Sequence, residues 1–326
     1  MVKIIKYYNY KKKIIIKTIV IVIIIVITIV LLQYIFTKYS FIELFNENTE
    51  NTENTESNNN IIKQDSAVFL GHLELGDNIT YIGALTFLMN YYNTIHFLCR
   101  DNYVENLNLL FKNNIINKNI ILVPVTSNNK VEESKTKISE FMQNNLTDIF
   151  ISGFMFTSDL KSRITHPNLL SYVQNDNGYT IEYKHVRDFY YDIGLDLSIY
   201  YNYFNIDSFK ESKEYFDAVK NYNIIFLHTQ SSYRELSLNN IIDKFINIPD
   251  AIIICANKNV YDITHNKYEL ANKYVNLLVP YYIDIICNAL EIHIVDSCFS
   301  CIVYPLNITK KLKASFVKIY DRNDNI

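Results

Sequence analysis

The sequence predicts an α/β fold with two Rossmann-like halves, each a doubly wound parallel sheet, behind an N-terminal transmembrane helix. Three observations predict it: an uncharged apolar run at residues 18–36, short apolar segments that alternate with longer helical segments from residue 67, and the restart of this alternation near residue 223. Repeated βα units are typical of parallel sheets, and two series of them indicate two sheets with a cleft between them. With 326 residues, 49% of them hydrophobic, the chain can bury a core in both halves.

The apolar run at residues 18–36 consists almost wholly of Ile, Val and Leu, and its length suits a helix that crosses a bilayer core of about 30 Å. A cleaved signal peptide would have a shorter apolar run and a small-residue cleavage site. Six lysines precede the run, so the positive-inside rule leaves the N-terminus in the cytoplasm. We therefore expect a single-pass type II membrane protein whose residues 1–17 form a cytoplasmic basic tail.

A polar segment separates the apolar run from the rest of the chain. Its residues 48–56 read Asn-Thr-Glu three times, a composition that cannot pack a core. We interpret residues 37–64 as a flexible stem, and a recognition signal for a partner is the alternative. Beyond the stem we expect a first Rossmann-like half at residues 65–205, irregular and aromatic from residue 154 on, and a second half at residues 206–326.

Short apolar runs predict the strands, and the longer segments between them predict the helices. In the first half we expect strands at Ala67–Gly71, Thr94–Cys99, Asn119–Val125 and Asp148–Gly153, and helices at Asn78–Tyr91 and Val131–Asn144. In the second half we expect strands at Asn223–His228, Ala251–Cys255, Asn276–Val279, Glu291–Asp296 and Ala314–Ile319, and helices at Leu236–Phe245, Tyr281–Leu290 and Ser297–Leu306. Parallel α/β sheets bind ligands beyond the carboxyl ends of their strands, so site residues are expected there.

Composition and missing motifs argue against several classes of protein. The net charge of -3 offers no basic field to nucleic acid. The chain has no Walker motif, no Gly-x-Gly-x-x-Gly and no Gly-x-Ser-x-Gly, which argues against a P-loop NTPase, an ordinary NAD dehydrogenase and a serine hydrolase. Five cysteines, an odd number, argue against a disulfide framework. The Cys298-x-x-Cys301 pair is interpreted as small packed residues, with a zinc or redox site as the alternative.

The first candidate site residues follow the first predicted strand. We expect Gly76 at a tight turn there and Asp77 at or near the N-cap of the next helix, with its carboxylate at the mouth of the cleft. Plain capping of the helix by Asp77 is the alternative, and it requires no function.

The segment Gly76-Asp77-Asn78-Ile79 resembles the Gly-Asp-x-Ile/Leu turn of GT-B glycosyltransferases, especially their heptosyltransferase-like group. It is also similar to the Gly-Leu-Gly-Asp-His-Ile turn of glycosyltransferase-like proteins from large DNA viruses and bacterial polysaccharide loci. In this chain Glu74 replaces the first Gly and Asn78 replaces the His. The resemblance implies a GT-B-like fold and makes Asp77 the general base that accepts the proton of an attacking sugar hydroxyl.

A second match lies at residues 291–301, where a predicted strand runs into a helix. The heptosyltransferase-like group has Asp-Thr-Gly-x-x-His here, and Asp296 and Ser297 match it in type, whereas Cys298 and Cys301 replace the Gly and the His. Free backbone N–H groups at the helix start, together with the Ser297 hydroxyl, are expected to hold a donor diphosphate. An ordinary Asp/Ser helix cap is the alternative.

Two further segments resemble the same proteins. The polar turn after the first strand of the second half contains Ser231 and Arg234, and Arg234 is expected to pair with the donor diphosphate. Asn257, in the turn after the next strand, is a further candidate for donor binding. A solvated loop is the alternative for this cluster. Near the end of the first half, His185 and Arg187 are expected to face the acceptor or to pack at a hinge.

These residues and the resemblance predict a membrane-anchored, metal-independent glycosyltransferase. It would move a sugar from a nucleotide-sugar donor, a substrate and not a cofactor, to a hydroxyl of a glycan or glycoprotein. No Asp-x-Asp triplet follows a strand in the body, which argues against a metal-dependent GT-A enzyme. Residues 18–36 would anchor the protein in a host endomembrane or a virion membrane. The alternative is a non-catalytic membrane or virion protein that retains a degenerate GT-B fold as a binding or interaction module.

Overall fold

A computed structural model describes residues 63–112, 119–143, 148–153, 156, 160–169, 184–232 and 235–321. The expected basic tail, the transmembrane helix and all but the last two residues of the expected stem lie outside the described residues. Within the described part of the chain, no helix is both long enough and apolar enough to cross a membrane. The described elements belong to one compact unit, residues 61–326.

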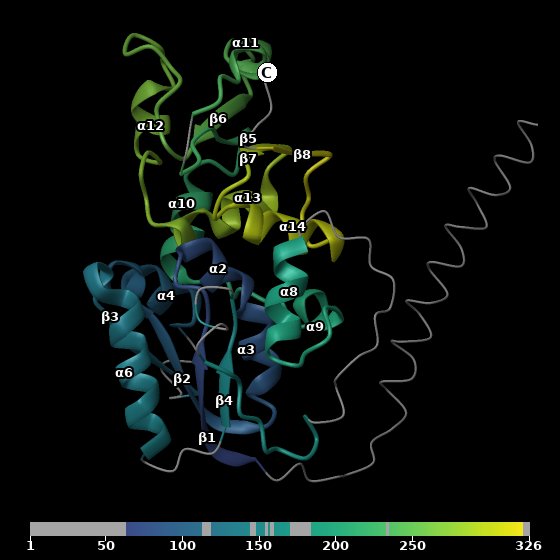
Figure 1. Ribbon diagram of the computed structural model, residues 1–326. Helices are drawn as coiled ribbons and strands as arrows, with labels where there is room; N and C mark the ends of the chain where they lie inside the picture. Colours follow the sequence, from purple (N-terminus) through teal and green to yellow (C-terminus); the bar gives the residue numbers. More distant parts are fainter. Residues whose placement is uncertain are drawn as a thin grey trace, which may run out of the picture. The chain divides into compact units, whose positions relative to one another are not determined.

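Two four-stranded sheets form the framework, and their strands are paired in parallel (Figure 1). The first sheet has the order β3-β2-β1-β4, with β1 (Gln64–Leu70), β2 (Tyr92–Arg100), β3 (Ile120–Val125) and β4 (Asp148–Ile151). The second has the order β6-β5-β7-β8, with β5 (Asn223–His228), β6 (Ala251–Cys255), β7 (Glu291–Val295) and β8 (Phe316–Tyr320). The structure thus confirms the prediction of two parallel α/β halves.

Both faces of the first sheet are covered, which explains why its strands are continuous apolar runs. Alternate side chains of β1 point to opposite faces. Phe69 packs in the same cluster as helix α3 (Ile82–Leu88), whereas Val68 packs in the cluster that contains Ile138 of α6 (Lys130–Gln143). This half also contains the short helices α2 (Leu75–Thr80) and α4 (Val104–Leu110).

The segment expected to be irregular contains two helices in its described part, α8 (Lys184–Asp192) and α9 (Ser198–Asn202). The buried hydroxyl of Tyr190 in α8 accepts a hydrogen bond of 3.0 Å from the Ala84 N–H in α3. A Cβ atom at Gly83 would lie only 2.9 Å from that hydroxyl, so the close approach of α8 to α3 requires glycine there. This packing places α8 beside the carboxyl end of the first sheet.

The second half repeats the two-faced arrangement. Ile225 and Phe226 are neighbours in β5 but belong to different buried clusters, one on each face of the sheet. The edge strand β8 is half-exposed. The helices described in this half are α10 (Lys210–Asp217), α11 (Asn239–Phe245), α12 (Tyr268–Asn272), α13 (Ile283–Asn288) and α14 (Ser300–Ile308), with the 3₁₀ helix η3 (Val279–Tyr282).

One predicted strand, Asn276–Val279, is wrong. Asn276 has a positive φ of 58° and donates its N–H to the carbonyl of Ala256, and the chain then turns into η3. A short apolar run can be buried by packing without pairing in a sheet, and periodicity does not separate the two cases. Two helix predictions also change: Asn78–Tyr91 is divided at Tyr81 into α2 and α3, and the helix expected from Ser297 begins at Ser300.

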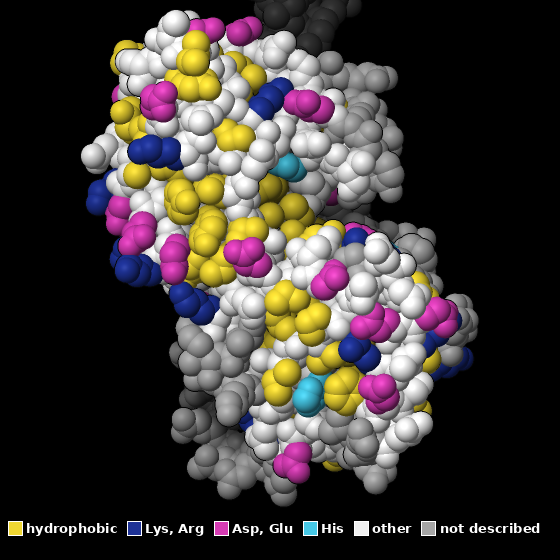
Figure 2. Space-filling view, turned by 90° about the vertical axis from the view of Figure 1, so that its left-hand side faces the viewer, with side chains coloured by type: hydrophobic (Ala, Val, Ile, Leu, Met, Phe, Trp, Pro, Cys, Tyr) yellow, Lys and Arg dark blue, Asp and Glu magenta, His cyan; other side chains and the backbone are white. Residues whose placement is uncertain are grey.

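The two halves contact each other through both side chains and backbone. Asn106 of α4 accepts a buried hydrogen bond of 3.0 Å from the Val279 N–H of η3. The Lys311 ammonium group donates to the carbonyl of Phe204 at 3.0 Å. Figure 2 shows hydrophobic side chains gathered across the middle of one face, between the upper and lower parts of the view.

Candidate functional site

Each sheet has one point where the order of its strands reverses, and such switch points are where open α/β sheets bind ligands. In the first sheet the switch point lies between β1 and β4, and in the second it lies between β5 and β7. The chain leaves these four strands at Gly71, Ser152, Thr229 and Asp296. The candidate site is therefore built from the residues that follow these strands.

Asp77 lies at the first switch point, and its carboxylate is bound by a histidine. The distance between Asp77 Oδ2 and His72 Nδ1 is 2.5 Å, and the two side chains are 21% and 12% exposed. Asp77 is the third residue of α2, whereas Glu74 is the N-cap residue and makes no side-chain capping bond. Asp77 therefore lies in the first turn of α2, near the N-cap as expected, but Glu74 is the cap residue and the Asp77 carboxylate is bonded to His72.

His72 is held from several sides. Its backbone N–H donates to the Tyr81 hydroxyl at 3.2 Å, and that hydroxyl donates to Ser152 Oγ at 2.9 Å. The imidazole ring stacks on the ring of Phe189 in α8, with centroids 6.0 Å apart. Gly153 has a φ of +93°, and a Cβ there would lie 2.9 Å from the His72 Cβ, so both its conformation and its surroundings require glycine.

Glu74 forms ion pairs with two cationic side chains beside this turn. Both of its carboxylate oxygens lie 2.8 Å from Arg100 Nη1, and Lys130 Nζ donates to it at 2.7 Å. Burial alone would raise the pKa of Glu74, but the hydrogen bonds from Lys130 and Tyr103 and the nearby positive charges hold it below its ordinary value. The residue that departs from the resembled motif therefore forms ion pairs with both Arg100 and Lys130.

Ser297 lies at the second switch point and is paired with a histidine that the sequence analysis did not select. Ser297 Oγ and His228 Nδ1 are 3.1 Å apart, and Oγ also accepts the Phe299 N–H at 3.4 Å. Since the hydroxyl accepts from Phe299, its proton is directed to His228 Nδ1. Burial lowers the pKa of His228 to about 4, so the imidazole is neutral at pH 7.

The backbone amides at this turn already have partners. The Ser297 N–H donates to Ser300 Oγ, and the Ser300 N–H donates to the Ser297 carbonyl. Ser300 Oγ in turn donates to Asp296 Oδ1 at 2.7 Å. The expectation of free N–H groups at Ser297 is therefore wrong for Ser297, Phe299 and Ser300. The helix begins three residues later than expected because this hydrogen-bonded turn precedes it.

The third predicted cluster is described only in part. Asn257 accepts the Thr229 N–H at 3.0 Å through Oδ1, so its side chain supports the turn after β5. Ser231 is buried in the same turn. Arg234 lies outside the described residues.

The fourth predicted cluster lies on α8. Arg187 is one-third exposed, with its Nε 3.6 Å from Asp188 Oδ1. The backbone of His185 is part of α8, but its side chain lies outside the described residues. Two described residues of α8 reach the first switch point: Phe189 contacts His72, and Asp192 Oδ2 accepts the Gly153 N–H at 2.8 Å.

Three residues of the site were not predicted: His72, His228 and Phe189. A signal was available for the two histidines, because His72 comes two residues after β1 and His228 ends β5, the central positions of the two sheets. Phe189 lies in the segment from which His185 and Arg187 were selected, but its contact with His72 depends on how α8 packs against the sheet.

The two switch points lie close together. A Cβ at Gly76 would be 3.3 Å from the Cα of Cys298 and from Cys301 Sγ. Gly76 is thus a helical residue in contact with the opposite half, not a residue of a tight turn. Both cysteines are free, and burial raises their pKa values to about 11 and about 12, so they stay protonated. Among the described residues, no three His, Cys, Asp or Glu side chains gather as a metal site would require.

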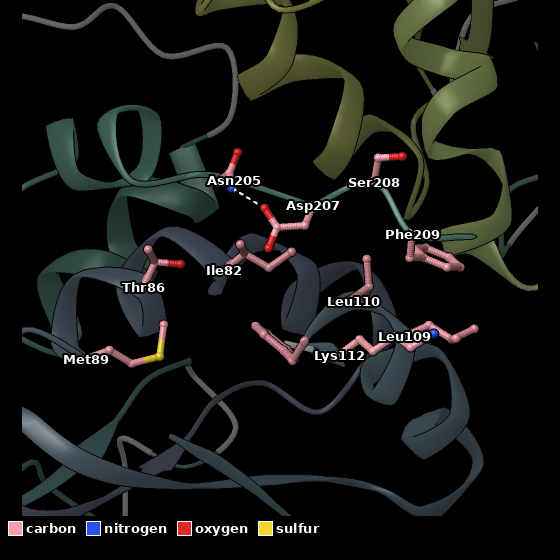
Figure 3. Close-up of a pocket in the computed structure, with 11 residues that line it drawn as sticks. Ile82, Thr86, Met89, Leu109, Leu110, Lys112, Asn205, Asp207, Ser208 and Phe209 are labelled. Atoms are coloured by element: carbon pink, nitrogen blue, oxygen red, sulfur yellow. Dashed lines mark hydrogen bonds between the residues drawn. The ribbon is translucent and has the colours of Figure 1, made fainter. Parts of the chain in front are cut away.

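A cavity of about 140 Å³ lies elsewhere, between α3, the end of α4 and the segment before α10 (Figure 3). Asn205 Nδ2 donates to Asp207 Oδ1 at 2.8 Å on its wall, and Lys112 Nζ lies 3.4 Å from Glu211. None of the predicted site residues lines this cavity. The chemistry at the switch points therefore lies outside the cavity.

Comparisons with known proteins give fold-level similarity of modest extent. No family model and no curated protein matches the sequence. Among solved structures, the chain is similar to a glycosyl transferase family 9 protein from Veillonella parvula, with a TM-score of 0.49 and 9% identity over 80% of this chain and 87% of that one. It is also similar to the ADP-heptose LPS heptosyltransferase II of E. coli, with a TM-score of 0.46 and 9% identity over 78% of this chain and 90% of that one. Values of this size do not assign the chain to either family.

Proposed function

We propose that the protein is a GT-B-type glycosyltransferase that moves a sugar from a nucleotide-sugar donor to a hydroxyl group of a glycan or glycoprotein. The observation that carries the proposal is the contact between the two switch points. Gly76, next to Asp77, lies against Cys298, next to Ser297. A carboxylate from one half and a hydroxyl-lined turn from the other are thereby available to one ligand pair.

The chemistry follows from these positions. An acceptor hydroxyl oxygen attacks the anomeric carbon of the donor, and the bond from that carbon to the diphosphate oxygen breaks. The hydroxyl proton passes to Asp77, a carboxylate that is 21% exposed, and the nucleoside diphosphate leaves with the bonding electrons. Among the described residues, His72 is the hydrogen-bonding partner of the Asp77 side chain, which leaves Oδ1 to receive the proton.

Donor binding is assigned to the second half. Ser231, Arg234, Asn257, Asp296 and Ser297 follow its strands, and the N-terminal end of α14 carries a partial positive charge that favours a diphosphate. Arg234 would neutralise the negative charge of the leaving group without a metal ion. His185 and Arg187 are assigned to the acceptor side or to the hinge.

Membrane anchoring completes the proposal. Residues 18–36 would hold the enzyme as a type II protein in a host endomembrane or a virion membrane, with the two sheets on the far side. Asn307, exposed in the sequon Asn307-Ile308-Thr309, offers a reporter of this orientation. Expression in a eukaryotic cell should give a glycan that is lost in Asn307→Gln, and protease added to sealed microsomes should spare the domain. Digestion of the domain without detergent would contradict the orientation.

A second candidate function has its own support. The Ser297 hydroxyl and several amides of the turn are already hydrogen-bonded within the chain, and the side chains of Cys298 and Cys301 occupy the junction between the halves. A non-catalytic membrane or virion protein that keeps the fold as a binding or interaction module would tolerate these features.

The deciding experiment measures donor hydrolysis and transfer. The full chain, purified in mild detergent, is incubated with UDP-glucose, UDP-N-acetylglucosamine, GDP-mannose and ADP-glucose, and the released nucleoside diphosphate is quantified. A glycosyltransferase should hydrolyse at least one donor slowly without acceptor and faster with one. Binding of a donor without any release of nucleoside diphosphate would favour the non-catalytic module. The absence of both binding and release would refute donor recognition altogether.

A further inference from the structure

We infer that His72 is a positioning residue for Asp77: its Nδ1–H fixes the carboxylate so that the opposite oxygen faces the acceptor. The inference rests on the proposed function, and neither the resemblance nor the comparisons supply it. It goes further because it adds a second residue to the base and gives each a separate role.

The proton in the short contact can be located by chemistry. An ionised carboxylate only accepts hydrogen bonds, so His72 Nδ1 must carry the hydrogen that points to Asp77 Oδ2, 2.5 Å away. The His72 side chain is 12% exposed and that of Asp77 is 21% exposed, so the carboxylate is the more accessible member of the pair. The carboxylate of Asp77 therefore lies nearer the solvent than the imidazole of His72.

The position of the imidazole ring is set by groups that do not contact Asp77. The ring stacks on Phe189, the His72 N–H is held by Tyr81, and Gly153 leaves room for His72, since a Cβ there would lie 2.9 Å from the His72 Cβ. Ser152 Oγ accepts a hydrogen bond from the Tyr81 hydroxyl and donates one to the Phe189 carbonyl at 2.7 Å. The same chain of hydrogen bonds therefore fixes both contacts of the histidine. A side chain built in this way can transmit a fixed geometry to its partner.

Glu74, three residues before Asp77, forms ion pairs of its own. Arg100 and Lys130 are both bound to the Glu74 carboxylate. Among the described residues, His72 is the hydrogen-bonding partner of the Asp77 side chain, and this bond selects the Asp77 rotamer. An aspartate without it would sample several rotamers, and a misplaced base loses rate without losing donor affinity.

A double-mutant cycle tests the inference on the full chain in mild detergent, with the donor from the UDP-, GDP- and ADP-sugar panel that the wild type hydrolyses fastest. His72→Ala should lower kcat by roughly 10-fold to 100-fold with the donor KM nearly unchanged. In an Asp77→Asn background the same change should have no further effect on kcat, because His72 acts through Asp77. His72→Asn should recover much of the rate, since its side-chain N–H can reach the position of Nδ1–H.

A control variant separates positioning from stability. His96→Ala removes a half-buried histidine in the middle of β2, against Phe141, and should lower the melting temperature without lowering kcat. Equal loss of kcat from His72→Ala in the wild-type and Asp77→Asn backgrounds would overturn the inference, and so would an unchanged kcat. If the wild type releases no nucleoside diphosphate, the proposed function fails, and the positioning role fails with it. This outcome is seen with the wild type alone, so it is distinguishable from a failure of the positioning role only.

Discussion

The first half of the molecule places His72 just beyond its central strand β1, and the second half ends its central strand β5 at His228. The two histidines thus occupy related positions at the two switch points, but their partners differ. His72 is bonded to a carboxylate of the helix that follows its own strand, whereas His228 is bonded to the hydroxyl of Ser297, which follows the neighbouring strand β7.

The difference in partners indicates a difference in task. The Asp77 carboxylate can accept a proton, and it is held by a donor that leaves its other oxygen unengaged within the described structure. His228 and Ser297 form a neutral pair, since burial keeps the imidazole uncharged at pH 7, and they fix the shape of a turn at a helix start. Under the proposed function, the switch point of the first sheet would serve proton transfer and that of the second sheet would serve donor placement.

The largest effect is expected for Asp77→Asn, which keeps the shape of the side chain and removes its basicity. Turnover should fall by about 10²-fold to 10⁴-fold, the usual contribution of a general base, while donor affinity stays nearly constant. Steady-state release of the nucleoside diphosphate and donor titration measure the two quantities. Wild-type turnover in this variant would end the assignment of proton transfer to the first half.

His228→Asn tests the neutral pair through the pH dependence of stability. The folded protein has a His228 pKa of about 4, whereas an unfolded chain has the ordinary value near 6.5. The unfolded state therefore binds the proton first as the pH falls, and the free energy of unfolding decreases between about pH 6.5 and pH 4, by up to about 3 kcal/mol. Above pH 6.5 this contribution is constant.

The measurement is the melting temperature of wild type and His228→Asn from pH 4.5 to pH 7.5. The variant should lose part of the decline on the acid side, although it is expected to be less stable at pH 7 because its bond to Ser297 is altered. Parallel curves for the two proteins would show that His228 is not a neutral group held by burial.

In both halves, the sequence predicted the strands and the polar residues that follow them better than it predicted contacts between distant residues. The strands were predictable because buried parallel strands are continuous apolar runs, and β5 and β6 lie at their expected bounds. Asp77 and Ser297 were found because polar residues after such strands must lie at the carboxyl end of a sheet. What was missed depends on distant contacts: Phe189 reaches His72 from α8, and Ser297 meets His228 across 69 positions of sequence.

The helix starts were mispredicted for a related reason. Asp77 was expected at or near an N-cap, and an Asp/Ser cap was the alternative at Ser297, but Glu74 takes the N-cap position before Asp77, and a hydrogen-bonded turn delays α14 to Ser300. Asp77 Oδ2 is bonded to His72, and Ser297 Oγ is shared between His228 and the Phe299 N–H. No local pattern distinguishes such a residue from a cap.

Ser297→Ala should have a smaller effect, confined to the donor side. It removes the acceptor of the Phe299 N–H and the partner of His228, so the turn loses two hydrogen bonds. Donor affinity should fall by roughly 10-fold, with kcat much less affected, because one hydrogen bond or its support is worth about 1 kcal/mol. Isothermal titration with the nucleoside diphosphate measures it, and an unchanged affinity would remove Ser297 from the donor site.

The smallest effect is expected from metal removal. A GT-A enzyme neutralises the donor diphosphate with a metal ion held by an Asp-x-Asp triplet, and no such triplet follows a strand in this body. The second half offers Arg234, the hydroxyl of Ser297 and the N-terminal end of α14 for the same task. Donor hydrolysis in the presence of excess EDTA should therefore match the untreated rate. Loss of activity with EDTA and its return with manganese would show that the diphosphate is neutralised by a metal, and the neutral pair at His228 would no longer explain how the second half holds its donor.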